Sequence, residues 1–235
     1  MRIAIFGGSF NPPTPAHIEI IRYLRNTLQI DKIVILPCGM RQDKPDLIDG
    51  HHRVSMIKTA CQNSFGEEPL CYSIYDPSIL LDRAALLIDE FEIVVNKKMM
   101  PTADLLRKYH HQSPGHDIHF VLGADLLQSI HTWEDYDSVL LQHRYIIFAR
   151  SGYQLELYHP IIKNSIVIDD HIFYDVSSTK IRFYLQLYMK ERQTNSLKRR
   201  MLLKKLSMLI DRQVLDYIIY HQLYGFQEKM EAALL

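Results

Sequence analysis

Short apolar runs rich in β-branched residues recur along most of the chain, and helix-like segments separate them. The runs are almost continuously hydrophobic instead of alternating with polar residues, which is typical of parallel strands in a sheet covered on both faces. The order strand, helix, strand predicts an α/β fold built on a doubly wound parallel sheet. We expect strands at Ile3–Phe6, Ile33–Leu36, Leu70–Ile74, Ile118–Leu122, Tyr145–Ala149 and Ile166–Ile168.

Helical periodicity is clear in three of the intervening segments. The first predicted helix covers about residues 15–28, the second runs from about His51 to Gln62, and the third starts near Thr102. Apolar residues at helical spacing should face the sheet from the first two helices. They are Ile18, Ile21, Leu24 and Leu28 in the first and Val54, Ile57 and Cys61 in the second.

The character of the sequence changes after Arg182. No strand pattern follows, and the segment is helix-like with basic clusters at residues 198–200 and 204–205. We expect a Rossmann-like core over residues 1–182 and a helical C-terminal subdomain, residues 183–235, packed on it. The basic clusters are interpreted as a solvated helix face, because apolar residues at helical spacing supply the opposite stripe. These are Leu202, Leu203, Leu206 and Leu209.

Charge and composition exclude several classes of protein. The 235 residues include 27 basic and 27 acidic side chains, so the formal net charge of zero provides no global field for nucleic acid or an anionic membrane. The apolar start is too short for a signal peptide, and no run reaches the roughly 18 to 20 apolar residues of a membrane span. Three cysteines without a CxxC pair are typical of a reducing compartment. We expect a cytoplasmic protein with no nucleic-acid or membrane partner, and leave open whether it is a homo-oligomer.

The segment that follows the first strand carries the strongest functional signal. Gly7 and Gly8 end the strand without side chains, so backbone can approach a ligand. Thr14 is placed to cap a helix whose first residue is Pro15, with His17 in the first turn. A helix N-terminus at the carboxyl end of a parallel strand favours a bound phosphate. The alternative is structural: a tight turn, a simple cap and a packing histidine.

Other common signatures do not occur. The chain has no GxGxxG and no GxxxxGK[ST], so neither the usual dinucleotide fingerprint nor the P-loop applies. Its 12 histidines include the pairs His51-His52 and His110-His111 but no HxxxH spacing, and we expect no protein metal site. His52 and Arg53 are expected to make helix-to-loop contacts near the substrate.

Two segments about 160 residues apart resemble one family. The stretch GGSFNPPTPAH, residues 7–17, resembles the [H/T]xGH nucleotidyltransferase signature in the form found in nicotinamide and nicotinate mononucleotide adenylyltransferases. VSSTKIR, residues 176–182, resembles the family's ISSTxIR. Further matches extend the resemblance over nearly the whole chain. They are Lys44, residues 52–54 with Met56, 102–104, 122–125, Trp133, Arg150 with 152–153, 214–218 and 223–225.

The chain departs from the family pattern at four places. Thr14 stands where bacterial members have the first histidine of the motif, and Ala16 stands where they have glycine. The connection between Arg182 and Val214 is longer than usual, and residues 96–101 differ from the bacterial substrate loop. The last departure leaves the choice between nicotinate and nicotinamide open.

The resemblance implies transfer of AMP from ATP to the phosphate of a pyridine mononucleotide, with Mg²⁺ accompanying ATP. A phosphate monoester is mostly ionised at neutral pH, its second pKa being about 6, so the reaction needs positioning and electrostatic stabilisation but no general base. The implied catalytic residues are His17, Lys44 and Arg182. The implied nucleotide-binding residues add Gly8, Ser9, Phe10, Thr14, Gly123, Asp125, Ser178 and Thr179, and the implied mononucleotide-binding residues are Asn11, Lys44, Thr102, Trp133 and Arg150.

Alternatives remain at this stage. The chain could be another nucleotidyltransferase of this fold, although it is long for a pantetheine-phosphate adenylyltransferase and lacks the RTxGISTT-like motif of cytidylyltransferases. It could be a regulatory nucleotide-binding protein without catalysis, against which the retention of His17 and Arg182 argues. Individually, Trp133 could be a core residue, and Asp125 and Thr102 could simply cap helices.

Overall fold

The computed structural model describes residues 1–67, 69–72, 85–149, 159–169, 176–191 and 196–225. Seven parallel strands form one sheet in the order β3-β4-β2-β1-β5-β6-β7. The strands are β1 (Arg2–Gly8), β2 (Lys32–Pro37), β3 (Leu70–Tyr72), β4 (Leu86–Asp89), β5 (Asp117–Gly123), β6 (Arg144–Phe148) and β7 (Ile166–Ile168). The predicted doubly wound α/β fold is confirmed.

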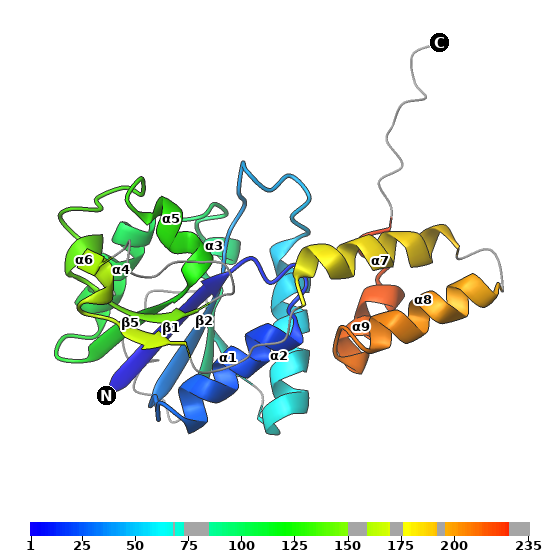
Figure 1. Ribbon diagram of the computed structural model, residues 1–235, viewed down its shortest axis with the longest axis horizontal. Coiled ribbons are helices and arrows are strands. Elements are labelled where there is room, and N and C mark those ends of the chain that lie inside the picture. The colour runs from blue at the N-terminus through cyan, green and yellow to red at the C-terminus, as the bar shows by residue number, and fades with distance from the viewer. Residues whose placement is uncertain (68, 73–84, 150–158, 170–175, 192–195, 226–235) are drawn as a thin grey trace, which may run out of the picture.

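Helices cover both faces of this sheet (Figure 1). They are α1 (Pro15–Asn26), α2 (Gly50–Phe65), α3 (Phe91–Val94), α4 (Thr102–Gln112), α5 (Leu127–Ile130), α6 (His159–Ile162), α7 (Ser178–Lys190), α8 (Leu197–Ser207) and α9 (Arg212–Tyr220). Side chains of α1 and α2 pack with Ala4 and Phe6 of β1 on one face. Those of α4, α5 and α6 pack with Ile3 and Ile5 on the other. The alternation along β1 shows why its run is continuously apolar: both faces are buried.

All six predicted strands are present among the described residues, and one strand was not predicted. The missed strand is β4, which lies between β2 and β3 and pairs in parallel with both. Its four residues are fully buried, and the run Leu86-Leu87-Ile88 was the signal that could have revealed it. Residues 73 and 74 of the strand predicted at Leu70–Ile74 lie outside the described part of the chain.

The strand order reverses at the centre of the sheet. β1 has β2 on one side and β5 on the other, so the connections from β1 and from β4 leave in opposite directions. In open α/β sheets, ligands bind at the carboxyl ends of the strands beside such a reversal. The loop after β1 therefore occupies the position that this fold offers to a ligand.

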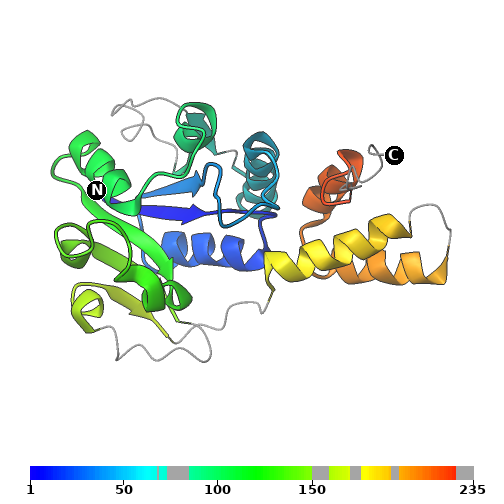
Figure 2. The same ribbon diagram turned by 90° about the horizontal axis from the view of Figure 1, so that it is seen from above.

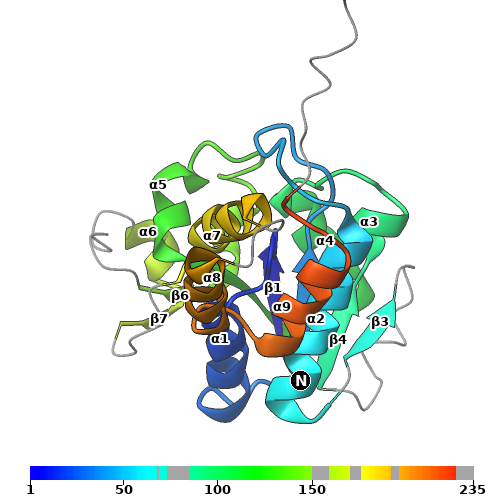
Figure 3. The same cartoon turned by 90° about the vertical axis from the view of Figure 1, so that its right-hand side faces the viewer.

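The last three helices form a unit beside the sheet. α7 and α8 run alongside each other and project away from it, and α9 lies next to α2 (Figures 2 and 3). Apolar residues of all three helices join the core cluster formed by α1 and α2. The expected boundary after Arg182 falls inside α7, so the division into residues 1–182 and 183–235 stays a proposal.

The outer surface of α8 is basic, as the sequence predicted. Lys198, Arg200, Lys204 and Lys205 are exposed while Leu206 and Leu209 are buried. The predicted apolar stripe was wrong at one position, because Leu203 is exposed.

None of the helices in the described ranges combines the length and apolar character that crossing a bilayer requires.

Candidate active site

The loop after β1 folds as its sequence predicted. Thr14 is the N-cap of α1, Pro15 is the first helical residue, and His17 is the third. Asn11 and Thr14 are buried although they are polar. Packing favours glycine at position 8, because a Cβ atom there would lie 3.0 Å from the ring of Phe10, which folds back over it. The result is a fixed turn that ends in a helix N-terminus.

His17 is held by hydrogen bonds through one ring nitrogen. The backbone N–H of Thr14 donates to Nδ1 of His17 over 2.9 Å, and the Thr14 hydroxyl lies 2.8 Å from the same nitrogen. Because a backbone N–H can only donate, Nδ1 is the acceptor, and in the neutral ring the proton is on Nε2. The capping contact thus makes Nε2–H the donor end of the neutral ring. The structural reading of Thr14 as a cap is confirmed, and it also sets the tautomer of His17.

The second motif contacts the first directly. α7 begins at Ser178, and its N-cap is Ser177. The Ser178 hydroxyl donates to the Pro12 carbonyl over 2.8 Å, and Nη1 of Arg182 donates to the Asn11 carbonyl over 2.9 Å. The N-termini of α1 and α7 therefore lie at one site, and both present backbone N–H groups and the positive end of a helix dipole.

Lys44 reaches this site from the loop after β2. Its Nζ donates to the Ser9 hydroxyl over 2.9 Å. Burial of the side chain, followed by the neighbouring Arg41 guanidinium, lowers the pKa of Lys44, and Arg182 acts in the same direction. Lys44 and Arg182 thus both contact the loop after β1, and an anionic ligand would stabilise these two positive charges.

Arg53 connects the loops that carry the site. It is only 2% exposed, and its guanidinium donates to the carbonyls of Ser9 (2.9 Å), Cys38 (2.7 Å) and Ile48 (3.0 Å). Burial lowers its pKa. The helix-to-loop contacts expected for Arg53 are confirmed. The expectation for His52 was wrong in its partner, because its Nδ1 lies 2.9 Å from the hydroxyl of Tyr217 on α9.

A buried carboxylate fixes a second pair of loops. Glu92 accepts hydrogen bonds from the backbone N–H groups of Gly39 (2.8 Å) and Met100 (3.0 Å). Burial raises its pKa, and the two N–H donors act in the opposite direction. A Cβ atom on Gly39 would lie 2.4 Å from the Lys98 backbone, so only glycine fits there. Glu92 thereby holds the backbone of Met100, two residues before α4 begins at Thr102, and the sequence did not predict this role.

The two motifs and the loop after β2 surround one cavity of about 330 Å³. Residues from both motifs and from the loop after β2 line it together. The lining consists of Ser9, Phe10, Asn11, His17, Asp43, Lys44, Pro45, Asp46, Leu47, Ser178, Thr179 and Arg182. Hydrogen-bond donors and cations converge from three sides, which is the arrangement that binds a polyphosphate and stabilises charge developing on it.

Comparison with known proteins agrees with this arrangement. A sequence model of the cytidylyltransferase-like family matches residues 5–183, which include both motifs. The chain belongs to this family. It is 30% identical to the probable nicotinate-nucleotide adenylyltransferase of Clostridium tetani over 190 residues, which cover 76% of this chain and 84% of that protein. The Streptococcus mutans protein of the same name is 27% identical over 225 residues, covering 95% and 88%.

The fold extends the likeness to a solved structure. Plasmodium falciparum nicotinic acid mononucleotide adenylyltransferase, complexed with NaAD, superposes with a TM-score of 0.73 and 25% identity, covering 95% of this chain and 97% of that one. Within its family, the chain is therefore a nucleotidyltransferase of the nicotinate-nucleotide adenylyltransferase group, an enzyme type of NAD biosynthesis.

Several residues predicted for this adenylyltransferase site do not line the cavity. Gly8 and Thr14 lie directly beside it, in the same loop. Gly123 ends β5, the neighbour of β1, and Asp125 lies inside the 3-10 turn Ala124–Leu126 that follows. Neither Asp125 nor Thr102 occupies a cap position, because Gly123 precedes the turn and Pro101 precedes α4.

The remaining two residues predicted to bind the mononucleotide differ in what the structure shows. Trp133 is partly buried and packs against the core of the α4 face, the contact that the core alternative predicts. Arg150 lies outside the described residues, as do residues 152 and 153. The roles of Thr102, Trp133 and Arg150 stay predictions.

Proposed function

We propose that this protein transfers the AMP moiety of ATP to nicotinate mononucleotide, giving nicotinate adenine dinucleotide and pyrophosphate. The observation that carries the proposal is the single cavity in which Ser9 and His17 of the first motif meet Ser178 and Arg182 of the second. The names of the related proteins support nicotinate as the acceptor's base.

The site residues suit a reaction that needs no general base. A phosphate oxygen of the mononucleotide attacks the α-phosphorus of ATP, the bond from that phosphorus to the β-phosphate oxygen breaks, and pyrophosphate leaves. Nε2–H of His17 donates to an α-phosphate oxygen as charge develops there. The N-terminus of α7 and Arg182 hold the β- and γ-phosphates, and Lys44 neutralises charge from the opposite loop.

Mg²⁺ enters as part of the ATP substrate. Magnesium usually keeps several waters and is bound largely through substrate phosphates. Among the described residues, no three His, Cys, Asp or Glu side chains are grouped to hold a metal ion. The ion offsets phosphate charge, while His17, Lys44 and Arg182 orient the phosphates.

The mononucleotide extends along the carboxyl edge of the sheet. We assign Gly123, at the end of β5, and Asp125, in the following turn, to the ATP side, with Asp125 accepting from a ribose hydroxyl; the position of β5 beside β1 supports this. We assign Thr102, Trp133 and Arg150 to the pyridine side, where an aromatic face can stack on the cationic ring. Asn11 orders the loop between the two substrates.

A direct assay tests the proposal. The full chain is incubated with ATP, Mg²⁺ and one acceptor at a time, and pyrophosphate release is followed. We expect release with nicotinate mononucleotide and a lower kcat/KM with nicotinamide mononucleotide. Phosphopantetheine serves as the control acceptor for the related pantetheine-phosphate activity. No release with either pyridine mononucleotide overturns the proposal.

A further inference from the structure

The chain returns to the active-site loop after α9. Beyond α9, the hydroxyl of Tyr224 lies 2.9 Å from Oδ1 of Asn11, which is 213 residues away in sequence. Asn11 is only 5% exposed and lines the cavity. No role in the site was predicted for Tyr224 from the sequence.

The other end of the Asn11 amide contacts the loop that carries Lys44. Nδ2 of Asn11 donates to the backbone carbonyl of Asp46 over 3.1 Å. A carbonyl can only accept, so the amide nitrogen must face Asp46 and the amide oxygen must face Tyr224. The Tyr224 hydroxyl is therefore the donor in its contact with Asn11. The Asp46 carbonyl sets the amide orientation, and the Tyr224 hydroxyl holds the amide in it from the other end.

The backbone around Tyr224 is held in a demanding conformation. Gln222 and Tyr224 both have left-handed φ angles, +55° and +63°, which cost residues other than glycine free energy unless their surroundings fix them. A Cβ atom on Gly225 would lie 2.7 Å from Cγ of Met189 in α7, so the chain passes close against that helix. Burial raises the pKa of Tyr224, which keeps its hydroxyl protonated and able to donate.

We infer that Tyr224 is a positioning residue of the active site, whose hydroxyl orients Asn11 and through it holds the loop of residues 43–47 in place. That loop brings Lys44 to the Ser9 hydroxyl. The main chain of Asn11 is tied separately, by Arg182 to its carbonyl. The C-terminal segment thereby completes a site formed mainly by the sheet domain. The effect on catalysis rests on the proposed function, whereas the hydrogen bonds that join Tyr224 through Asn11 to the loop of residues 43–47 do not.

Two tyrosine variants separate this role from general docking of the C-terminal unit. Tyr224→Phe removes the hydroxyl that orients Asn11 and keeps the ring. Tyr217→Phe is the matched control, because its hydroxyl also joins the C-terminal unit to the core, through His52, and not through a residue of the cavity. We expect similar Tm values for the two variants. We expect kcat/KM for ATP to fall about tenfold in Tyr224→Phe and to stay within twofold of wild type in Tyr217→Phe.

Hydrogen exchange provides a readout that does not depend on activity. The backbone N–H groups of Lys44 and Leu47 donate within the loop, to the carbonyls of Arg41 and Lys44, so loosening of the loop exposes them. We expect their exchange to be about tenfold faster in Tyr224→Phe and unchanged in Tyr217→Phe. Equal exchange in Tyr224→Phe and wild type overturns the inference, whatever the activity. A wild-type chain that releases no pyrophosphate overturns the proposed function instead. The exchange comparison still tests whether Tyr224 holds the loop of residues 43–47.

Discussion

At the scale of single residues, His17 illustrates how one side chain serves structure and chemistry. Its Nδ1 accepts from the backbone of Thr14 and completes the N-terminal cap of α1. That contact fixes both the ring orientation and the tautomer, so the neutral ring carries its proton on Nε2 before any ligand binds. Preorganised donors of this kind stabilise a transition state without reorganisation at the moment of reaction. In the proposed mechanism, capping and catalysis thus depend on the same ring.

Replacing His17 should separate the two tasks. In His17→Asn, the amide oxygen can still accept from the Thr14 backbone, but the donor at the position of Nε2 is lost. We expect kcat to fall by about 10² or more, the usual effect of losing one such donor, with Tm within a few degrees of wild type. Steady-state kinetics and calorimetry measure both quantities. Full activity in this variant would exclude a catalytic role for His17.

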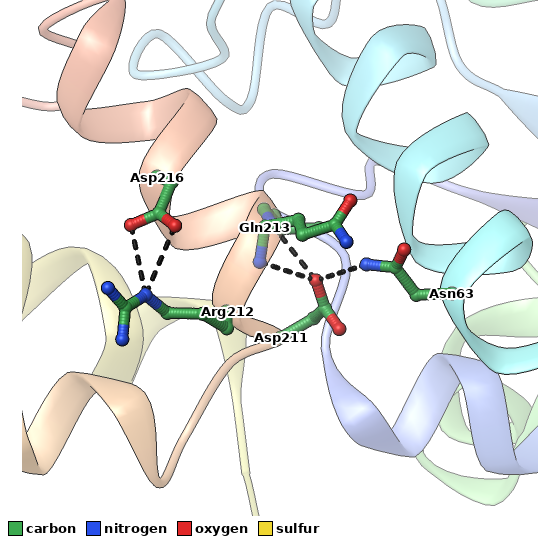
Figure 4. Close-up of polar contacts among 6 residues, drawn as sticks. Asn63, Asp211, Arg212, Gln213 and Asp216 are labelled. Atoms are coloured by element: carbon green, nitrogen blue, oxygen red, sulfur yellow. Dashed lines mark hydrogen bonds and ion pairs between the residues drawn. The ribbon is translucent and has the colours of Figure 1, made fainter.

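At the scale of secondary-structure elements, helix ends decide how the C-terminal unit attaches. Asp211 caps α9 by accepting from the backbone N–H groups of Gln213 (2.9 Å) and Val214 (3.0 Å). The same oxygen also accepts from Nδ2 of Asn63 on α2, over 2.9 Å (Figure 4). One carboxylate therefore satisfies the start of α9 and ties it to the helix that carries Arg53.

Two aspartates on this element allow a matched comparison. Asp211→Ala should lower the free energy of unfolding by about 1–2 kcal/mol, because it removes an N-cap. Asp216→Ala removes the same charge but only an exposed ion pair with Arg212 (Figure 4), and should cost less than about 0.5 kcal/mol. Urea denaturation measures both. Equal losses would show that the cap contributes nothing specific.

At the scale of the whole molecule, stability depends on buried histidines at the edge of the sheet opposite the active site. His143 is 6% exposed, and its Nδ1 lies 3.1 Å from Nε2 of His110. Burial, followed by the neighbouring His110 and His119, lowers the pKa of His143 to about 3. Burial also lowers the pKa of His119. The native protein therefore keeps these rings neutral at pH values where an unfolded chain would bind protons.

The direction of the pH dependence follows from those lowered pKa values. Near pH 7 both native and unfolded forms hold His143 neutral, so its contribution is fully present above the unfolded pKa of about 6.5. As pH falls toward 3, only the unfolded state gains the proton, and stability drops by about 1.4 kcal/mol per pH unit for this group. His143→Asn should reduce that slope between pH 6 and 4, measured by urea denaturation. The exposed His131→Asn is the control, and equal slopes in the two variants would contradict the assignment.

Much of the site was predictable because its sequence signals are local. Thr14, Pro15 and His17 form a cap within four residues, so the residues alone predicted one phosphate-binding helix end. The family resemblance implied the second, at Ser178 and Thr179, where α7 begins with Ser177 as its N-cap. The nearly continuous apolar runs of β1 and β5 likewise indicated a parallel sheet that is buried on both faces. The short β4 was missed, because the three apolar residues Leu86, Leu87 and Ile88 do not by themselves distinguish a strand from a buried turn of helix.

The sequence by itself determined the fold class, the two motifs and the cap that orients His17, since helix capping and strand burial depend on residues a few positions apart. Only the tertiary structure decided which distant groups meet. Arg53 finds three loop carbonyls, His52 contacts Tyr217 instead of a substrate loop, and Tyr224 reaches Asn11. Such contacts depend on how α9 packs against α2 and how the chain turns after it. That packing is set by the shapes of many side chains together, and no short stretch of sequence encodes it.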